Sequence, residues 1–194
     1  VYVLYNTWIK KRKWEMSLVQ LDDTGKILWK KRYGTRGSEL ATGITRLEGG
    51  DLLLLGTTET EEDSYGASKG KTDIILLRIS ERGKILWRAR FGGSETELAY
   101  DITAEKKDVY WIFGSTQSKD GDVGKHLGGS DILLLKVTGQ GLLLDSQTYG
   151  TYEEEYPVQL LVGKEQLSAL AATRVSENLS IPFLIRTELA GDEK

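Results

Sequence analysis

The stretch TDIILLRISERGKILWRARFGG, residues 72–93, decides the fold. It contains an apolar segment, a glycine turn and a second segment that ends at an aromatic residue. The same order occurs upstream in residues 15–34 and downstream in residues 130–150. Each copy has one glycine at the same place in the turn: Gly25, Gly83 and Gly141. These glycines are 58 residues apart, and repeats of such length are typical of one supersecondary unit that is copied and stacked.

Each repeat unit divides into four short apolar segments, which we name A to D in chain order. In the second unit they cover residues 40–47, 51–57, 73–79 and 85–91. Runs such as LLLL and ILLL are apolar on both faces and bounded by Gly, Asp and Thr, which is typical of buried strands. The first unit lacks segment A and the last lacks segment D. The sequence therefore predicts sheets of three, four, four and three strands.

Four short antiparallel strands in each of several repeats are the pattern of β-propeller blades. We therefore predict an all-β fold: a β-propeller, or a propeller segment, of four-stranded antiparallel blades with a 58-residue repeat. A solenoid of strand-plus-helix repeats is excluded because no stretch has helical periodicity. The whole chain forms one propeller-like domain. Its predicted parts are a partial blade at 1–34, blades at 35–92 and 93–150, and a partial blade at 151–194.

The alignment of the units makes two further predictions. In segment B, Asn6 and Ala172 stand in the places of Gly56 and Gly114. At the end of the chain, the apolar segment Phe183–Ile185 has no predicted neighbour on one side, and an open strand edge invites pairing. Closed propellers need about 4–8 blades. We therefore expect the chain to be part of a larger propeller or to form a homo-oligomer.

Composition limits the classes of function. Hydrophobic residues make up 39% and charged residues 28% of the 194 residues, as in ordinary globular proteins. A net charge of −3 argues against a nucleic-acid partner, and the basic run at residues 10–13 is interpreted as a solvated hairpin turn. A membrane-spanning helix needs about 20 consecutive apolar residues, and no apolar run in the sequence approaches this length. The absence of Cys excludes disulfides and cysteine nucleophiles, and the charge-rich composition is typical of thermophile proteins.

The segments DTGKILW at residues 23–29 and RGKILW at residues 82–87 resemble the tryptophan-docking motif of quinoprotein-type propellers. The wider unit resembles bacterial β-propeller repeat proteins of the SBBP type. The resemblance implies that Trp29 and Trp87 pack between neighbouring blades, although aromatic platforms for a sugar or cofactor are the alternative. It also implies a secreted, periplasmic or cell-envelope location. The third copy departs from the motif because Asp145 replaces the tryptophan.

The loops from D to A and from B to C should lie on one rim, because strand direction alternates. Loops on a rigid scaffold are where binding usually resides. The predicted binding residues are Arg36, Glu39, Glu97, Glu155, Asp120 and Asp122, together with Trp111, which lies either in the core or in the channel lining. Further acidic residues of the same loops are Glu59, Glu61, Glu62 and Asp63.

Two sets of these carboxylates have alternative interpretations. Glu39, Glu97 and Glu155 begin segment A in successive units, where they form either a ring at the channel mouth or caps of the turns between blades. Asp120 and Asp122 are the candidate Ca²⁺ ligands, since Ca²⁺ prefers carboxylate and carbonyl oxygens. Their loop lacks the third acidic or amide position of a calcium-binding loop. A solvated turn is therefore the alternative.

Catalytic patterns are weak in this chain. His126 is the single His and lies in a glycine-rich loop, so neither a histidine metal cluster nor a Ser-His-Asp triad can be assembled. We therefore predict no cofactor and a non-catalytic scaffold that binds a protein or other partner through its rim. The alternative is part of a propeller enzyme, quinone- or carbohydrate-processing, whose catalytic groups lie outside this chain.

Overall fold

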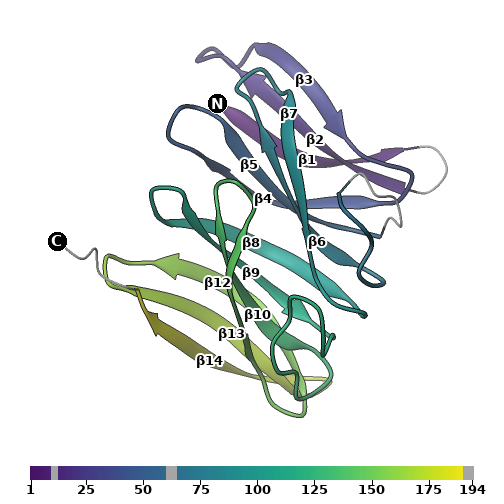
Figure 1. The fold of residues 1–194 in the computed structure, drawn as a ribbon, viewed down its shortest axis with the longest axis vertical. Helices are drawn as coiled ribbons and strands as arrows, with labels where there is room; N and C mark the ends of the chain where they lie inside the picture. Colours follow the sequence, from purple (N-terminus) through teal and green to yellow (C-terminus); the bar gives the residue numbers. More distant parts are fainter. Residues whose placement is uncertain (10–12, 60–64, 190–194) are drawn as a thin grey trace.

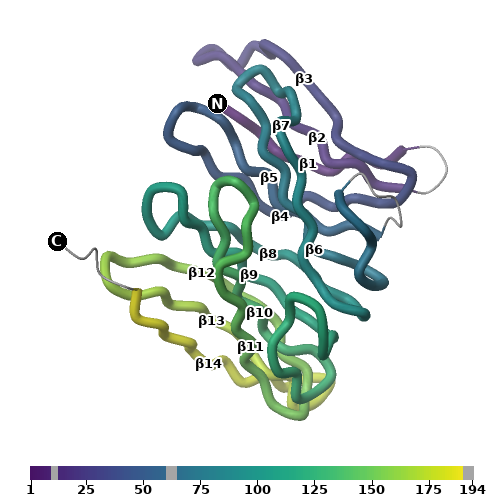
Figure 2. The backbone as a smooth tube through the Cα atoms, viewed as in Figure 1, coloured from purple at the N-terminus to yellow at the C-terminus, as the bar shows by residue number. Residues whose placement is uncertain are grey.

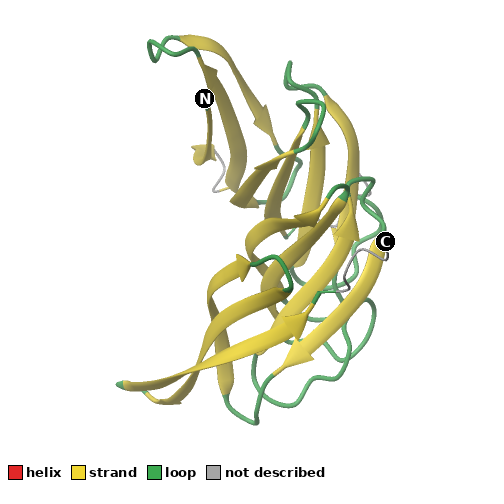
Figure 3. Ribbon diagram, turned by 90° about the vertical axis from the view of Figure 1, so that its left-hand side faces the viewer, coloured by secondary structure: helices red, strands yellow, loops and turns green. Residues whose placement is uncertain are grey.

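A computed structural model describes residues 1–9, 13–59 and 65–189. These residues form fourteen strands and no helix (Figure 3), which confirms the all-β prediction. None of the described residues belongs to a helix that is long and apolar enough to cross a membrane. The basic positions 10–12 and the acidic residues Glu61, Glu62 and Asp63 lie outside the described residues.

The strands form four antiparallel sheets of three, four, four and three strands, as the segment count predicts (Figure 1). The first sheet contains β1 (Tyr2–Ile9), β2 (Lys13–Leu21) and β3 (Ile27–Tyr33). The second contains β4 (Glu39–Arg46), β5 (Leu52–Thr58), β6 (Asp73–Ile79) and β7 (Ile85–Phe91). The third contains β8 (Glu97–Lys106), β9 (Val109–Thr116), β10 (Asp131–Thr138) and β11 (Leu143–Tyr149). The fourth contains β12 (Glu154–Val162), β13 (Gln166–Ser176) and β14 (Leu179–Glu188).

The four sheets follow one another along the molecule in chain order, from β1–β3 at one end to β12–β14 at the other (Figure 2). We call the three places where neighbouring sheets meet the first, second and third junctions. Each junction contains one hydrophobic cluster. In β5, Leu52 and Leu54 face the first junction, whereas Leu53 and Leu55 face the second. Strands of the middle sheets are apolar on both faces because each face meets another sheet.

Contacts between neighbouring sheets are concentrated on one side. Among the described residues, every extended strand-to-strand contact across a junction includes β4, β8 or β12, the first strands of their sheets. Strand β4 contacts β8, and β8 contacts β12. The last strands β3, β7 and β11 do not take part in such contacts. Neighbouring sheets are therefore close together on the side of β4, β8 and β12 and farther apart on the other.

The turn before the last strand has the same conformation in three sheets. Gly25, Gly83 and Gly141 have φ angles of 83°, 73° and 79°, a region that only glycine enters without strain. In the second sheet the amide of Gly83 donates to the carbonyl of Ser80 at 2.7 Å. The equivalent amide of Gly141 donates to the carbonyl of Thr138 at 2.9 Å. The recurring glycine is thus required by the backbone of this turn.

Strand pairing corrects the alignment of segment B. Gly56 of β5 pairs with Ile75 of β6. Ile75 also pairs with Arg90 of β7, and one repeat earlier Ser17 of β2 pairs with Arg32 of β3. Ser17 is therefore the residue of the first sheet that is equivalent to Ile75. Ser17 pairs with Tyr5, so the prediction that Asn6 takes the glycine position is wrong. A shift of one residue moves a side chain to the other face of a sheet. Tyr5 therefore lies on the face that no other described sheet covers.

The same correction applies to the fourth sheet. Gly114 pairs with Ala99, and the residue that follows Ala99 after one repeat is Pro157. Pro157 pairs with Ala171 and not with Ala172, so the second alignment prediction is also wrong. The reason is a hairpin between β12 and β13 that is one residue shorter than the hairpin between β8 and β9.

Candidate functional site

The loops that connect the sheets and the long loops inside them contact one another, so they form one rim. The amide of Lys71 donates to the carbonyl of Glu95 at 2.9 Å, and the amide of Asp122 donates to the carbonyl of Gly92 at 3.0 Å. Near the third junction the amide of Gly129 donates to the carbonyl of Glu153 at 3.0 Å. These hydrogen bonds fix loops 65–72 and 117–130 against the connecting loops.

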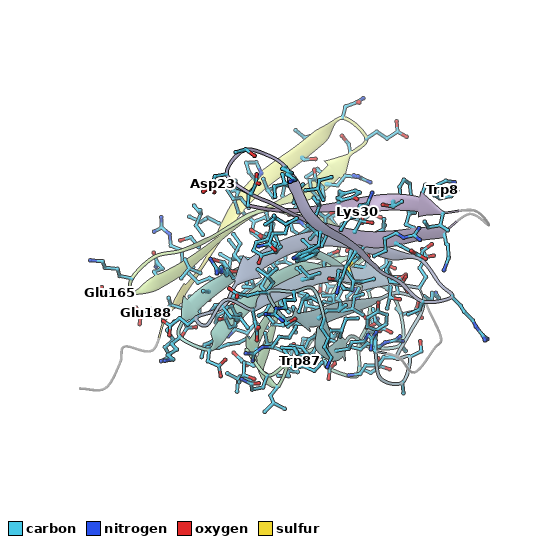
Figure 4. The ribbon with its side chains drawn as sticks, turned by 90° about the horizontal axis from the view of Figure 1, so that it is seen from above. Trp8, Asp23, Lys30, Trp87, Glu165 and Glu188 are labelled. Carbon is cyan, nitrogen blue, oxygen red and sulfur yellow. The ribbon has the colours of Figure 1, made fainter. Side chains whose placement is uncertain are left out.

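Two tryptophans that the sequence analysis did not single out lie at this rim. Trp8 and Trp14 face each other across the β1–β2 hairpin, with ring centroids 4.9 Å apart in an edge-to-face arrangement. The amide of Trp14 donates to the hydroxyl of Ser38 in the first connecting loop at 3.3 Å. Trp8 is 54% and Trp14 37% exposed. Figure 4 shows Trp8 at the opposite end of the sheets from Glu165. In the sequence, the only sign of this aromatic pair was that Trp8 and Trp14 lie on both sides of the basic run at residues 10–13.

The three repeated glutamates are buried. Glu39 accepts hydrogen bonds from the amide and hydroxyl of Thr35, and Glu155 accepts the same two from Thr151, with the amide bonds at 3.0 Å and 3.1 Å. Glu97 accepts the amide of Gly93 at 2.8 Å and the hydroxyl of Thr116 at 2.6 Å. Each carboxylate thus caps the turn four residues before it. This burial corrects their placement among the partner-binding residues of the rim.

Burial also changes the acidity of Glu39. Removal from water raises the pKa of its carboxyl above the usual value, and the hydrogen bonds from Thr35 and Thr58 partly oppose this rise. A carboxylate in this position costs folding free energy when it ionises. The capping role therefore depends on hydrogen bonds that offset the lost hydration.

Asp120 and Asp122 hold the second connecting loop. Asp120 accepts the amide of Ser94 at 2.7 Å, and Asp122 accepts the amide of Gly92 at 3.1 Å and forms an ion pair with Lys69. Between them Gly121 has a φ of 68°. These contacts are those of a tight turn. Among the described residues, no group of three or more Asp, Glu or His side chains could hold a metal ion.

The two other predicted rim residues lie in different surroundings. Arg36 is exposed in the first connecting loop. Trp111 is 1% exposed within the hydrophobic cluster of the third junction, so it belongs to the core. Its indole nitrogen donates to the carboxylate of Glu105 at 2.6 Å, and the ammonium of Lys136 lies 5.2 Å from the ring centroid.

The tryptophans of the repeated motif lie against the turn glycine of the next sheet. A Cβ atom added to Gly83 would come within 3.1 Å of the Trp29 ring, and one added to Gly141 within 2.8 Å of the Trp87 ring. Gly25 has no atom within 4 Å of the same point, since no described sheet precedes the first. The two contacts connect the outer strands β3 and β7 to the following sheet.

The surface has a cavity at the rim and a groove beside the fourth sheet. The cavity of about 420 Å³ lies between Ser94, Lys119 and His126, whose ring nitrogens are both buried without a hydrogen-bond partner in the described residues. The groove of about 630 Å³ lies between the end of β11 and the free edge of β14, where Tyr149 and Phe183 contribute to its walls. The sequence predicts an open strand edge at Phe183–Ile185, and these residues form one wall of the groove.

The chain matches no protein-family model, and no curated protein matches it significantly.

Proposed function

We propose that the four sheets are consecutive blades of a β-propeller whose axis runs beside β4, β8 and β12. The observation that supports this is the one-sided contact between neighbouring sheets, which concentrates on these three strands. Sheets that are close on one side and apart on the other turn about an axis. Trp29 and Trp87 fill the wider outer gap, where a large aromatic side chain is needed.

On this scaffold the protein has a non-catalytic role, the binding of a protein partner through its rim. Trp8, Trp14 and Tyr152 are exposed there, with Tyr152 at 86%. Arg36 is exposed in a connecting loop of the same rim. Trp, Tyr and Arg are the residue types that contribute most binding energy at protein interfaces. The carboxylates of Glu39 and Glu97 cap turns, which leaves the aromatic residues as the main contact groups.

Assembly with further blades is part of this proposal. Leu184 of β14 is 48% exposed, whereas the equivalent residues Leu18, Leu76 and Leu134 are fully buried. Leu184 thus has the position of a core residue without a covering sheet. A fifth sheet, from a second copy or from a larger propeller, would cover it.

The alternative, part of a quinone- or carbohydrate-processing propeller enzyme, has one observation in its favour, the exposed Trp8–Trp14 pair, which could hold a sugar. Exposed indole rings offer apolar faces to a sugar as well as to a protein. A single experiment distinguishes the two partners. A photo-reactive amino acid is placed at Trp8, at Tyr152 and, as a control away from the rim, at the exposed Leu86 of β7.

After irradiation in the native host, we expect one discrete protein adduct from positions 8 and 152 and none from position 86. A glycan array and melting curves with oligosaccharides and quinones are recorded in parallel. Adducts from all three positions alike, or no protein adduct from either rim position, would overturn the proposed protein-binding role. A melting shift with a sugar or quinone but no adduct would favour the enzyme alternative.

A further inference from the structure

Two carboxylates and one glycine recur at each junction, and at the second and third junctions the two carboxylates lie against that glycine. One carboxylate lies at or near the start of β2, β6 or β10, and the other lies at or near the start of β4, β8 or β12, the first strand of the next sheet. The sets are Glu15, Gly34 and Glu39; Asp73, Gly92 and Glu97; and Asp131, Gly150 and Glu155. A Cβ atom added to Gly92 or to Gly150 would come within 3.0 Å of an oxygen from both carboxylates of its set. The two acids therefore point at the same place.

The first two junctions supply positive charge to this pair. Glu15 lies 3.3 Å from the ammonium of Lys13 and 3.8 Å from Nε of Arg32. Asp73 forms an ion pair with Arg90 at 3.2 Å, with side chains only 1% and 2% exposed. An opposite charge of this kind offsets the cost of burying a carboxylate.

The third junction differs at the position of the arginine. Thr148 pairs with Leu133 as Arg90 pairs with Ile75, so Thr148 replaces the guanidinium. Among residues 1–9, 13–59 and 65–189, neither Asp131 nor Glu155 forms an ion pair with a Lys or Arg. Both acids are 1% exposed. Two buried carboxylates are thus side by side without a protein cation.

One oxygen of this pair has no hydrogen-bond partner among the described residues, as is also true of Asp73 Oδ1 at the second junction, where Arg90 nevertheless supplies a positive charge. Asp131 Oδ2 accepts the amide of Leu127 at 2.7 Å, and both oxygens of Glu155 accept hydrogen bonds from Thr151. Asp131 Oδ1 is buried without a hydrogen-bond partner in the described part of the chain, and it points towards Gly150 beside Glu155 Oε2. A buried charged oxygen without a partner is costly.

We propose that Asp131 and Glu155 bind a hard divalent cation of the Ca²⁺ type at the third junction. Carboxylate oxygens are the ligands such ions prefer, and Ca²⁺ completes its shell with main-chain carbonyls and water. Two positive charges neutralise the two carboxylates, as Lys13 and Arg32 do beside Glu15. The site is distinct from Asp120 and Asp122, and it does not depend on the proposed rim function.

The test compares melting temperatures of EDTA-treated protein with and without Ca²⁺. At about 100 times the dissociation constant, we expect Ca²⁺ to raise the melting temperature by about 5–10 °C, with one ion per chain by calorimetry. The double variant Asp131→Asn/Glu155→Gln should lose this rise. The variant Thr148→Arg, which places an arginine at the position of Arg90, should melt higher in EDTA and lose the response.

Two control variants keep the test specific, Asp145→Asn on the exposed part of β11 and Asp120→Asn/Asp122→Asn on the rim. Both should retain the full rise. A rise that survives in Asp131→Asn/Glu155→Gln would place the ion elsewhere and overturn the proposal. So would a wild-type protein whose melting temperature does not change with either Ca²⁺ or Mg²⁺. If Thr148→Arg does not fold, the near-isosteric double variant decides.

Discussion

The contact between a tryptophan and the next turn glycine can be measured with a control that the chain itself provides. We consider the substitutions Gly25→Ala and Gly141→Ala. Both glycines have positive φ angles, 83° and 79°, so the methyl group costs about 1–2 kcal/mol of backbone strain at either position. Only Gly141 has a neighbour. Its added Cβ would lie 2.8 Å from Cζ3 and 3.0 Å from Cη2 of Trp87.

The clash between the added methyl group and the Trp87 ring is a second cost, which only Gly141→Ala has, and it measures the docking contact. Forcing an extra carbon into a packed contact typically costs about 1–3 kcal/mol. Gly141→Ala should therefore lose about 2–5 kcal/mol of unfolding free energy in total, against about 1–2 kcal/mol for Gly25→Ala. Since about 1 kcal/mol corresponds to 2–4 °C in a chain of this size, the difference is measurable by thermal or urea denaturation.

A double-mutant cycle identifies the partner. In a Trp87→Ala background the colliding ring is absent and only Ala89 Cβ, 3.2 Å from the added Cβ, stays close, so the cost of Gly141→Ala should fall towards that of Gly25→Ala. The coupling free energy between positions 87 and 141 should then be about 1–3 kcal/mol, the cost of forcing the extra carbon against the ring. Equal losses for Gly25→Ala and Gly141→Ala in the wild-type background would refute the docking of Trp87 on the next sheet.

Three further predictions concern buried polar groups. Arg90→Ala should cost about 3–5 kcal/mol because it leaves Asp73 charged and buried, whereas Arg174→Ala, in an exposed pair, should cost less than about 1 kcal/mol by urea denaturation. Burial raises the pKa of Tyr33 to about 12, so the wild-type protein should lose stability as the pH rises from about 10 through 12. Tyr33→Phe should lose about 1 kcal/mol at pH 7 and lose less further stability than the wild type at alkaline pH, where Tyr65, whose pKa burial also raises, still contributes. Burial raises the pKa of Glu39, so the wild-type protein should lose stability relative to Glu39→Gln as the pH rises from 4 to 8, and a constant difference across these melting curves would contradict this.

The sequence was most informative where one residue type satisfies a local requirement. Gly83 recurs because the turn needs a positive φ, and the apolar runs recur because both faces of a strand are covered. Register was less predictable, since a hairpin one residue shorter moved Ala171 into the place assigned to Ala172. Repetition alone could not separate a ring of carboxylates from turn caps. The contacts of Glu39 and its equivalents decide this question.

Two features needed three-dimensional neighbours to be found. The exposed Trp8–Trp14 pair depends on the pairing of β1 with β2, which brings residues on both sides of a basic run together. The uncompensated Asp131–Glu155 pair becomes visible only when strand pairing shows that Thr148 replaces Arg90. Neither the motif nor the composition contains this information.

The central claim, that the sheets turn about an axis, is tested most directly by spin-label distances. The chain has no Cys, so pairs of labels can be placed at the equivalent exposed turn positions Thr24, Arg82 and Gln140. We predict equal distances for 24–82 and 82–140, and a 24–140 distance about 1.4–1.85 times as long, as in rings of about 4–8 blades. A 24–140 distance twice the adjacent one would show a straight stack and contradict the propeller.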